Sequence, residues 1–277
     1  QMDAYPDARH YTDFYEMLEK EKLDILDICV PTFLHTKFAL AAMKKGIHVL
    51  CEKPVSMEVG DVELLYRTAE ENHVKFMVAQ CIRFWPEYVL LKEIYDTGRY
   101  GKLLSGEMER LGCYPKWSWD GWMMDEPRSG FVPFDLHIHD LDFVVYGFGA
   151  PVKVDHFRSK QKDQDFLHAV YSYPDFFISA EASWFAAPYP FHMSFRFQFE
   201  EAVVAYEGAK LSIYQRDGKV VCPFDDTDAA EFSQLPQSSG YANEIHYFYD
   251  CVRQNKPQNI VKKEELETVL KILKDMN

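Results

Sequence analysis

The 277-residue chain lacks any apolar run that approaches the roughly 18 residues needed to cross a membrane. It also lacks an excess of basic side chains, because 30 Lys and Arg against 44 Asp and Glu leave a net charge of −14. Nucleic acids and anionic membranes bind basic surfaces, so we expect neither as a partner. No signal-peptide pattern is present, and the composition is typical of a cytoplasmic protein.

Cysteine is sparse, with six residues spread over the chain and no C-x-x-C pair. Three of the six lie within or beside apolar, strand-like runs. We therefore expect buried free thiols rather than a framework of disulfide bonds.

The first part of the chain alternates short apolar runs with helical patterns. The runs that predict buried strands are 25–30, 47–51 and 74–79, and the predicted helices are 12–22, 37–45 and 56–72. Strands that alternate with helices form parallel β-α-β crossovers. Residues 1–82 are therefore predicted to be an incomplete Rossmann-type domain with a doubly wound parallel sheet.

The pattern changes after about residue 100. Strands are predicted at 103–110, 166–173, 176–184, 191–199, 211–214 and 219–221, and helices at 242–253 and 264–276. Residues 83–277 are therefore predicted to form an α+β domain with a large, mainly antiparallel open sheet. Its many aromatic residues suggest that one face packs on helices and the other on a second subunit, in a homodimer or homotetramer.

Two polar clusters carry the chemistry of the sequence. Lys53, within Glu52-Lys53-Pro54, directly follows a predicted buried strand, where open α/β sheets bind their ligands. About eighty residues on, the segment 135–142 contains Asp135 and His139. One lysine, one carboxylate and one imidazole suffice to move a proton at neutral pH.

Three motifs in order resemble the Gfo/Idh/MocA oxidoreductases. The family patterns T-P-x-x-x-H, aGkhV followed by E-K-P, and G-G-x-x-x-D-x-G-x-H-x-x-D are matched here by residues 30–35, 45–54 and 130–142. The resemblance implies a Rossmann domain followed by an α+β domain. It also implies oxidation or reduction of sugars, polyols or cyclitols with NAD or NADP.

The resemblance also assigns residues to roles, position by position. Lys53, Asp135 and His139 match the family's catalytic set. The expected cofactor contacts are Pro31, Thr32, His35, Glu52, Lys53 and Arg83, and the expected substrate contacts are Lys53, Asp135, His139 and Trp122. Glu52 matches the residue beside the cofactor ribose, and Arg83 falls in a stretch usually written N-x-R-F-x-P.

The proton transfer has two possible assignments. In one, His139 takes the hydroxyl proton while Lys53 stabilises the developing alkoxide. In the other, Lys53 is the base and His139 only orients the substrate. Asp135 lies four residues before His139, so on a helical turn its carboxylate would orient the ring or raise its basicity.

The sequence departs from the family pattern at several points. The phosphate-binding G-x-G-x-x-G is absent, so we expect about fifty more residues before Gln1 in the natural protein, as the family's order of elements implies. The residue that selects NAD or NADP would lie there. His137 replaces a glycine and would add a titratable ring near the site, and Phe131 and Cys81 replace the usual glycine and asparagine.

Other interpretations remain open at this point. The cluster Asp135, His137, His139, Asp140 and Asp142 has metal-binding residue types, but the resemblance explains it without a metal. Trp117, Trp119 and Trp122 form either a sugar-stacking wall or a packing surface between domains or subunits. A glycosidase that uses NAD for transient oxidation, and a cofactor-sensing regulator without catalysis, are alternative functions.

Overall fold

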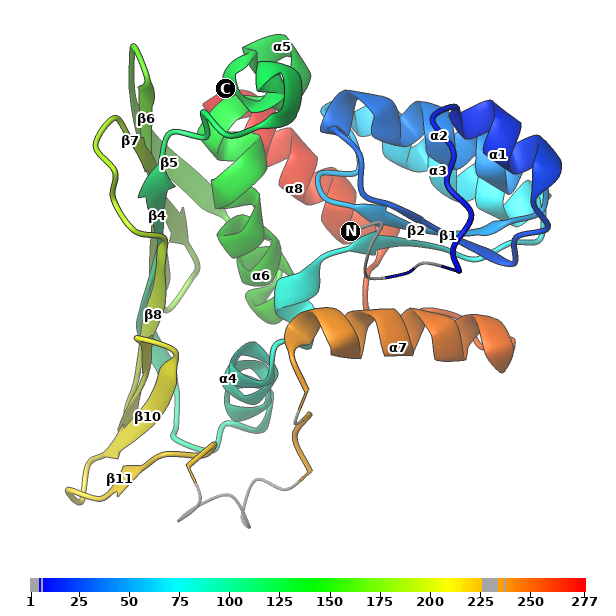
Figure 1. Ribbon diagram of the computed structural model, residues 1–277. Coiled ribbons are helices and arrows are strands. Elements are labelled where there is room, and N and C mark those ends of the chain that lie inside the picture. The colour runs from blue at the N-terminus through cyan, green and yellow to red at the C-terminus, as the bar shows by residue number, and fades with distance from the viewer. Residues whose placement is uncertain (1–4, 6, 226–233, 237) are drawn as a thin grey trace.

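The computed structural model describes residues 5, 7–225, 234–236 and 238–277 (Figure 1). Its first part contains α1 (Phe14–Lys20), β1 (Ile25–Ile28), η2 (Thr32–Leu34), α2 (His35–Met43), β2 (His48–Glu52), α3 (Val59–Glu71), β3 (Phe76–Ala79) and η3 (Cys81–Phe84). The strands form a parallel sheet in the order β1-β2-β3. Helices α1, α2 and α3 lie on one side of it in Figure 1, and the late helix α7 (Gly240–Arg253) lies on the other.

The apolar character of β2 and β3 explains their central place in this part. Val49, Leu50 and Cys51 are all buried, as is every residue of β3. Such strands require cover on both faces, which the helices supply. The register pairs Glu52 with Ala79, the last residues of β2 and β3. Lys53 and the start of η3 therefore both follow the carboxyl ends of these neighbouring strands.

The second part is built on an eight-stranded sheet. Its strands are β4 (Leu103–Cys113), β5 (Lys153–Gln161), β6 (Gln164–Ser172), β7 (Phe177–Phe185), β8 (His192–Phe199), β9 (Ala202–Glu207), β10 (Lys210–Gln215) and β11 (Val220–Val221). They follow the order β11-β10-β9-β8-β4-β7-β6-β5, and every neighbouring pair is antiparallel except β4 and β7. A parallel sheet followed by a large, mainly antiparallel sheet is the fold class that the sequence predicted.

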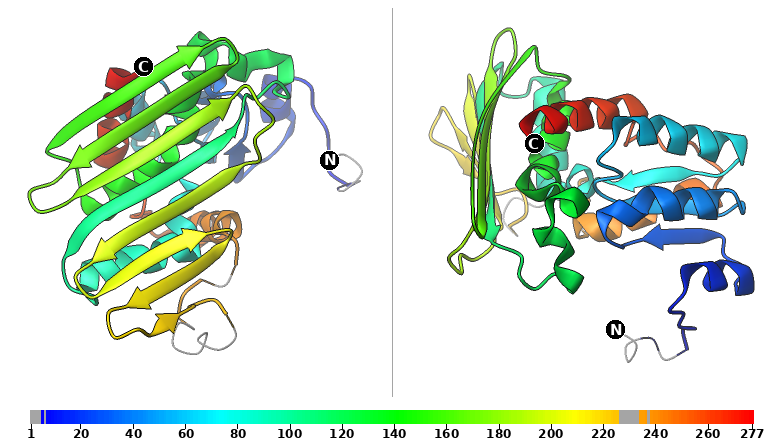
Figure 2. Two further views of the ribbon diagram at one scale, coloured as in Figure 1. Left: turned by 90° about the vertical axis from the view of Figure 1, so that its left-hand side faces the viewer. Right: turned by 90° about the horizontal axis from the view of Figure 1, so that it is seen from above.

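Helices cover one face of the large sheet. They are α4 (Pro86–Thr97), α5 (Glu126–Ser129), α6 (Ile138–Phe148) and α8 (Lys263–Met276), with η4 (Trp119–Met124) and η5 (Pro133–His137). The α8 helix packs against both α3 and α6 and so joins the two sheets. The other face carries no helix of the described chain (Figure 2).

Two strands of the large sheet were not predicted. β5 has hardly a buried residue, and its sequence KVDHFRSKQ shows no apolar alternation. Its backbone pairs with β6 throughout, so pairing with a neighbour rather than side-chain burial creates it. β9, with the sequence AVVAYE, was also missed, although its short apolar run is followed by the turn residue Gly208. Among the described residues, no helix is long and apolar enough to cross a membrane.

Candidate active site

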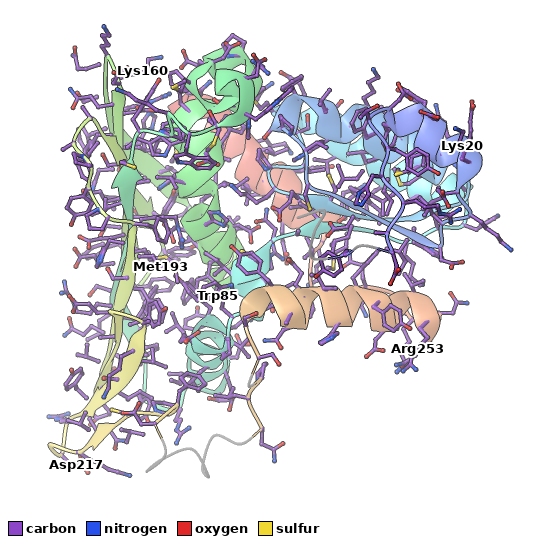
Figure 3. All side chains as sticks on the ribbon, in the orientation of Figure 1. Lys20, Trp85, Lys160, Met193, Asp217 and Arg253 are labelled. Carbon is purple, nitrogen blue, oxygen red and sulfur yellow. The ribbon has the colours of Figure 1, made fainter. Side chains whose placement is uncertain are left out.

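A cavity of ≈440 Å³ lies where the edge of the parallel sheet meets the large sheet. Glu52, Lys53 and Trp85 line it from one side, and Arg110 and Met193 line it from the other. Figure 3 shows Trp85 at the start of α4 and Met193 on β8, facing the space between the two parts. The cavity therefore occupies the carboxyl end of the parallel strands, where α/β sheets bind ligands.

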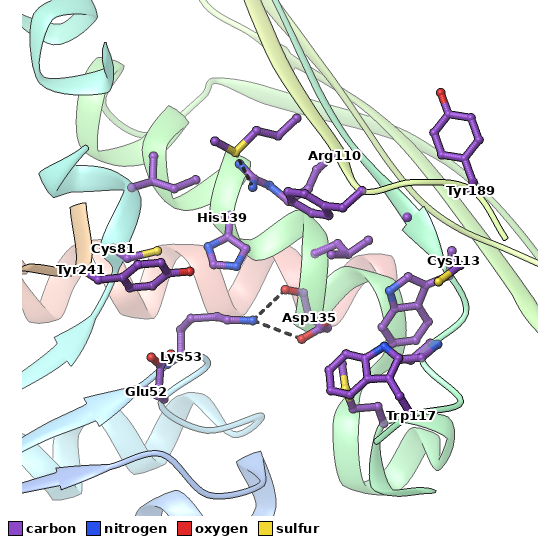
Figure 4. A pocket seen from close by; sticks show the side chains of 18 of the residues that line it. Glu52, Lys53, Cys81, Arg110, Cys113, Trp117, Asp135, His139, Tyr189 and Tyr241 are labelled. Carbon is purple, nitrogen blue, oxygen red and sulfur yellow. Dashed lines mark hydrogen bonds and ion pairs between the residues drawn. The ribbon is translucent and has the colours of Figure 1, made fainter. Parts of the chain in front are cut away.

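Lys53 and Asp135 meet in this cavity although 82 residues separate them. The Lys53 Nζ donates a hydrogen bond of 2.8 Å to the main-chain oxygen of Asp135, and it lies 3.2 Å from the Asp135 Oδ1 (Figure 4). The two side chains are 14% and 18% exposed, so the pair keeps access to the cavity. The structure thus brings together the two motifs that the sequence analysis singled out.

Asp135 does not orient His139, contrary to the prediction from their spacing. The Asp135 carboxylate pairs with Lys53, and the His139 Nδ1 is buried without a hydrogen-bond partner in the described chain. Residues 133–137 form a π-helical turn. Its wider winding moves side chains four residues apart out of line, which a sequence rule for α-helices misses.

His139 lines the cavity above Lys53 (Figure 4). Burial, with smaller contributions from the positive charges of Lys53 and Arg110, holds the pKa of His139 well below its usual value. The ring is therefore neutral at pH 7. On the opposite side, burial raises the pKa of Glu52, although the Lys53 charge opposes this shift.

His35 joins two loops at the edge of the parallel sheet. Its ring nitrogens lie 2.8 Å from the main-chain oxygens of Val30 and Pro54, and only 1% of the side chain is exposed. Burial lowers the pKa of His35, and these two oxygens partly offset the effect. His35 thus fixes the loop that presents Lys53. Neither it nor Pro31 or Thr32 lines the cavity.

Arg83, predicted to contact the cofactor, lies elsewhere. Its side chain has no exposed surface and makes hydrogen bonds of 2.7 and 2.8 Å to the Asp142 carboxylate. It also binds Glu265 and the main-chain oxygen of Ile260. This enclosed and paired guanidinium connects η3, α6 and α8, and its contact with the cofactor stays a prediction.

Two further residues of the sequence analysis, Trp122 and His137, do not line the cavity. Trp122 does not line the cavity and packs partly buried on the core, whereas Trp117 of the same segment does line it. His137 is fully buried with its Nε2 against the hydroxyl of Tyr171. Burial lowers the pKa of His137 to about 3.

Arg110 and Tyr241 are cavity residues that sequence reasoning missed. Arg110 is buried on β4, with its Nη2 2.9 Å from Asp140 Oδ1. Tyr241, in the first turn of α7, lies beside Cys81 at the cavity (Figure 4). Neither belongs to a motif, because each is brought to the site from a distant element. Asp140 pairs with Arg110, and Asp142 pairs with Arg83. These ion pairs account for two carboxylates of the cluster that the sequence analysis also considered as a metal site.

Comparison with known proteins agrees with this geometry. Residues 1–80 match the model of an oxidoreductase family with an NAD-binding Rossmann fold, and residues 88–205 match the model of the GFO/IDH/MocA C-terminal domain. The chain belongs to the Gfo/Idh/MocA family. The motif-based prediction of the family is thereby confirmed, together with its fold class and, at the level of the family, a nicotinamide cofactor.

Several Gfo/Idh/MocA relatives have known activities. Myo-inositol 2-dehydrogenase of Thermotoga maritima is 28% identical over 52% of this chain and 41% of its own length. The 2,7-anhydro-N-acetylneuraminate hydratase of Mediterraneibacter gnavus is 28% identical over 50% of this chain and 37% of its own length. The chain thus spans about two fifths of these relatives.

Solved structures show the same fold. A levoglucosan dehydrogenase in complex with NADH and levoglucosan superposes with a TM-score of 0.81 at 18% identity. The match covers 99% of this chain and 82% of that one. At this level of identity the superposition establishes the Gfo/Idh/MocA fold, and the chemistry has to be argued from the cavity.

Proposed function

We propose that this chain forms part of an NAD(P)-dependent oxidoreductase that transfers hydride between nicotinamide and a hydroxyl or carbonyl group of a sugar, polyol or cyclitol. The observation that carries the proposal is the Lys53–Asp135 pair beside neutral His139 in one cavity. Relatives named as inositol and levoglucosan dehydrogenases support it.

The residues present fit a nicotinamide cofactor. Glu52 lines the cavity, and its Oε2 accepts a 3.2 Å hydrogen bond from the Lys53 main-chain nitrogen. Its carboxyl group can accept further bonds from ribose hydroxyls. The Nδ1 of His139 is an unsatisfied buried atom next to the same space. The bound nicotinamide would supply the hydride acceptor or donor for the reaction.

The chain's own groups would manage the proton. Asp135 holds the Lys53 ammonium in place, so Lys53 can donate a hydrogen bond to the reacting oxygen and stabilise its developing negative charge. His139, being neutral, would accept the hydroxyl proton. Lys53 as the base is the second assignment, and the observation in its favour is the burial of His139, which disfavours the charged form of that ring.

A substrate screen on the natural full-length protein tests the proposal. Sugars, polyols and cyclitols are supplied with NAD and with NADP, and the absorbance of the reduced nicotinamide is followed. Lys53→Ala should lower kcat by roughly 10²–10⁴-fold for any substrate that gives a signal. Product formation without net accumulation of reduced nicotinamide would instead support the glycosidase that uses NAD for transient oxidation. Bound cofactor without any turnover would favour the regulator.

We infer further that the protein works in the cytoplasm as a homodimer or homotetramer. The face of the large sheet that no helix of the described chain covers supports the oligomer, since it offers a broad surface on which a second subunit can pack (Figure 2). Six free cysteines support a reducing compartment. Sedimentation of the full-length protein tests the oligomer, and a monomer at micromolar concentration would refute it.

A further inference from the structure

Two loops meet at one end of the large sheet, at the mouth of the cavity. One follows β4 and carries Trp117, and the other joins β7 to β8 and carries Tyr189 and Phe191. β4 lies between β7 and β8, with Cys113 paired to Phe185 and Leu111 to His192. The two loops therefore leave the same end of adjacent strands.

The aromatic rings on these loops line the cavity and remain largely in water. Trp117 is 77% exposed, Phe191 63% and Tyr189 42%. Aromatic surface that is exposed beside a cavity is available to a ligand, and covering it with an apolar face of the ligand is favourable. The structure supports two of them from behind, because Tyr189 packs edge-on against Phe185 at 5.0 Å and Phe191 lies across Gly112.

The cations that line the cavity are already paired. Lys53 lies on Asp135, and Arg110 reaches both carboxylate oxygens of Asp140 at 2.9 and 3.2 Å. The remaining Nη1 of Arg110 faces the sulfur of Met193 at 3.3 Å. Among the described lining residues there is thus no cation left to neutralise a phosphate or carboxylate, and Glu52 adds a carboxyl group. Burying an unpaired anion there would be costly.

We propose that the substrate is an uncharged saccharide or polyol whose C–H face stacks on the aromatic wall formed by Trp117, Tyr189 and Phe191. This inference rests on the oxidoreductase function proposed above. The face of an aromatic ring carries partial negative charge and attracts weakly positive C–H groups. A sugar ring on this wall presents its hydroxyl rim to Lys53, Asp135 and His139, which the same cavity contains.

The test of the aromatic wall compares two tryptophans of one segment. Trp117 lines the cavity, whereas Trp119 is 70% exposed and does not line it. In the full-length, cofactor-loaded protein, Trp117→Ala should weaken saccharide binding, measured by calorimetry, about 3- to 10-fold. In steady-state kinetics the same substitution should act mainly by raising KM. Trp119→Ala should change it less than about 2-fold. Equal effects of the two substitutions would contradict the proposal that the saccharide stacks on Trp117.

The charge prediction is tested with matched probes. Glucose and myo-inositol are compared with glucose 6-phosphate, glucuronate and UDP-glucose at low salt, and the neutral compounds should bind at least about 10-fold more tightly. Tighter binding of an anionic probe that is also oxidised would overturn this inference and leave the proposed function intact. Neutral probes that bind on the wall without any hydride transfer would support this inference and contradict the proposed oxidoreductase function. If no saccharide binds, the inference fails.

Discussion

Glu244 lies on the buried face of α7 with 2% of its surface exposed, and its Oε1 has no hydrogen-bond partner in the described chain. Burial raises the pKa of Glu244 to about 9, and the carboxylates of Glu52, Asp27 and Asp142 add to the shift. At the residue scale, the folded chain therefore keeps a carboxyl group protonated at neutral pH close to its cavity. An unfolded chain would release that proton near pH 4.5.

The sign of the effect on stability follows from this difference. Below pH 4.5 both states hold the proton, and as the pH rises toward 9 only the folded state does, so stability is lost over that window. Glu244→Gln keeps the shape without the titration. It should increase the free energy of unfolding at pH 8 by on the order of 1–3 kcal/mol, and change it little at pH 4.5. Urea denaturation at both pH values measures this, and an equal effect at both would contradict the assignment.

Phe131 shows how one residue can depart from a family pattern and still adopt its backbone. The position usually holds glycine, and here Phe131 has φ 56°, in the left-handed region that glycine adopts freely. The preceding Gly130 has φ 70°, and an added Cβ there would lie 2.5 Å from the Phe134 ring. Two successive residues with positive φ thus form the turn before Asp135, although only one of them is glycine.

At the scale of single elements, the first turn of α7 is fixed closely against η3. The Asn243 side chain donates a 3.0 Å hydrogen bond to the Phe84 main-chain oxygen, and Ser239 caps the helix at Ala242. A Cβ at Gly240 would lie 1.7 Å from the Trp85 ring. The glycine therefore allows the close approach that brings Tyr241 to the cavity.

Substituting this glycine should disturb both the helix and the site. In Gly240→Ala the added methyl group cannot be accommodated without moving α7 or Trp85, so we expect a loss of about 1–3 kcal/mol in the free energy of unfolding. Gly60→Ala, where no atom lies within 4 Å of the added Cβ, is the matched control and should be neutral or slightly stabilising. Denaturant titrations of the two variants compare them directly. Similar stabilities would mean that α7 does not need this approach.

At the scale of the whole molecule, the buried ion pairs hold the two sheets in one arrangement. Arg83 connects η3 to Asp142 on α6 and Glu265 on α8, and its guanidinium stacks 4.5 Å from the Tyr146 ring. Arg110 on the large sheet pairs with Asp140, the residue that follows His139 on α6. The same helix thus carries the groups that anchor both parts of the molecule and the histidine at the cavity.

Removing Arg83 should destabilise the protein rather than abolish one contact with a cofactor. Arg83→Ala leaves Asp142 buried without its partner, and we expect a loss of about 3–5 kcal/mol in the free energy of unfolding. The double variant Arg83→Met/Asp142→Leu should recover much of this loss, because the fully buried charge of Asp142 is removed with its partner and the partly exposed Glu265 keeps Lys262 at 3.8 Å. Thermal and urea unfolding of the single and double variants give the comparison. A double variant as unstable as Arg83→Ala would argue against the ion pair as the cause.

Short-range patterns were sufficient for much of the fold. Alternation and apolar runs predicted β1–β3 and the main strands of the large sheet, because burial of one or both faces imposes a period that a single segment already shows. β5 was not predicted, because its extended conformation depends on backbone pairing with β6 and not on an apolar pattern of its own. The π-helical turn at residues 133–137 also escaped prediction, and with it the true partner of Asp135.

The sequence by itself determined the family, the parallel-then-antiparallel architecture, and the three groups Lys53, Asp135 and His139, since each stands in a local motif. Only the tertiary structure decided which groups pair: Lys53 with Asp135, Arg83 with Asp142, and Arg110 with Asp140. These partners are 30 to 82 residues apart in the chain. Their choice depends on which charges are buried together, and burial is a property of the packed molecule rather than of any segment.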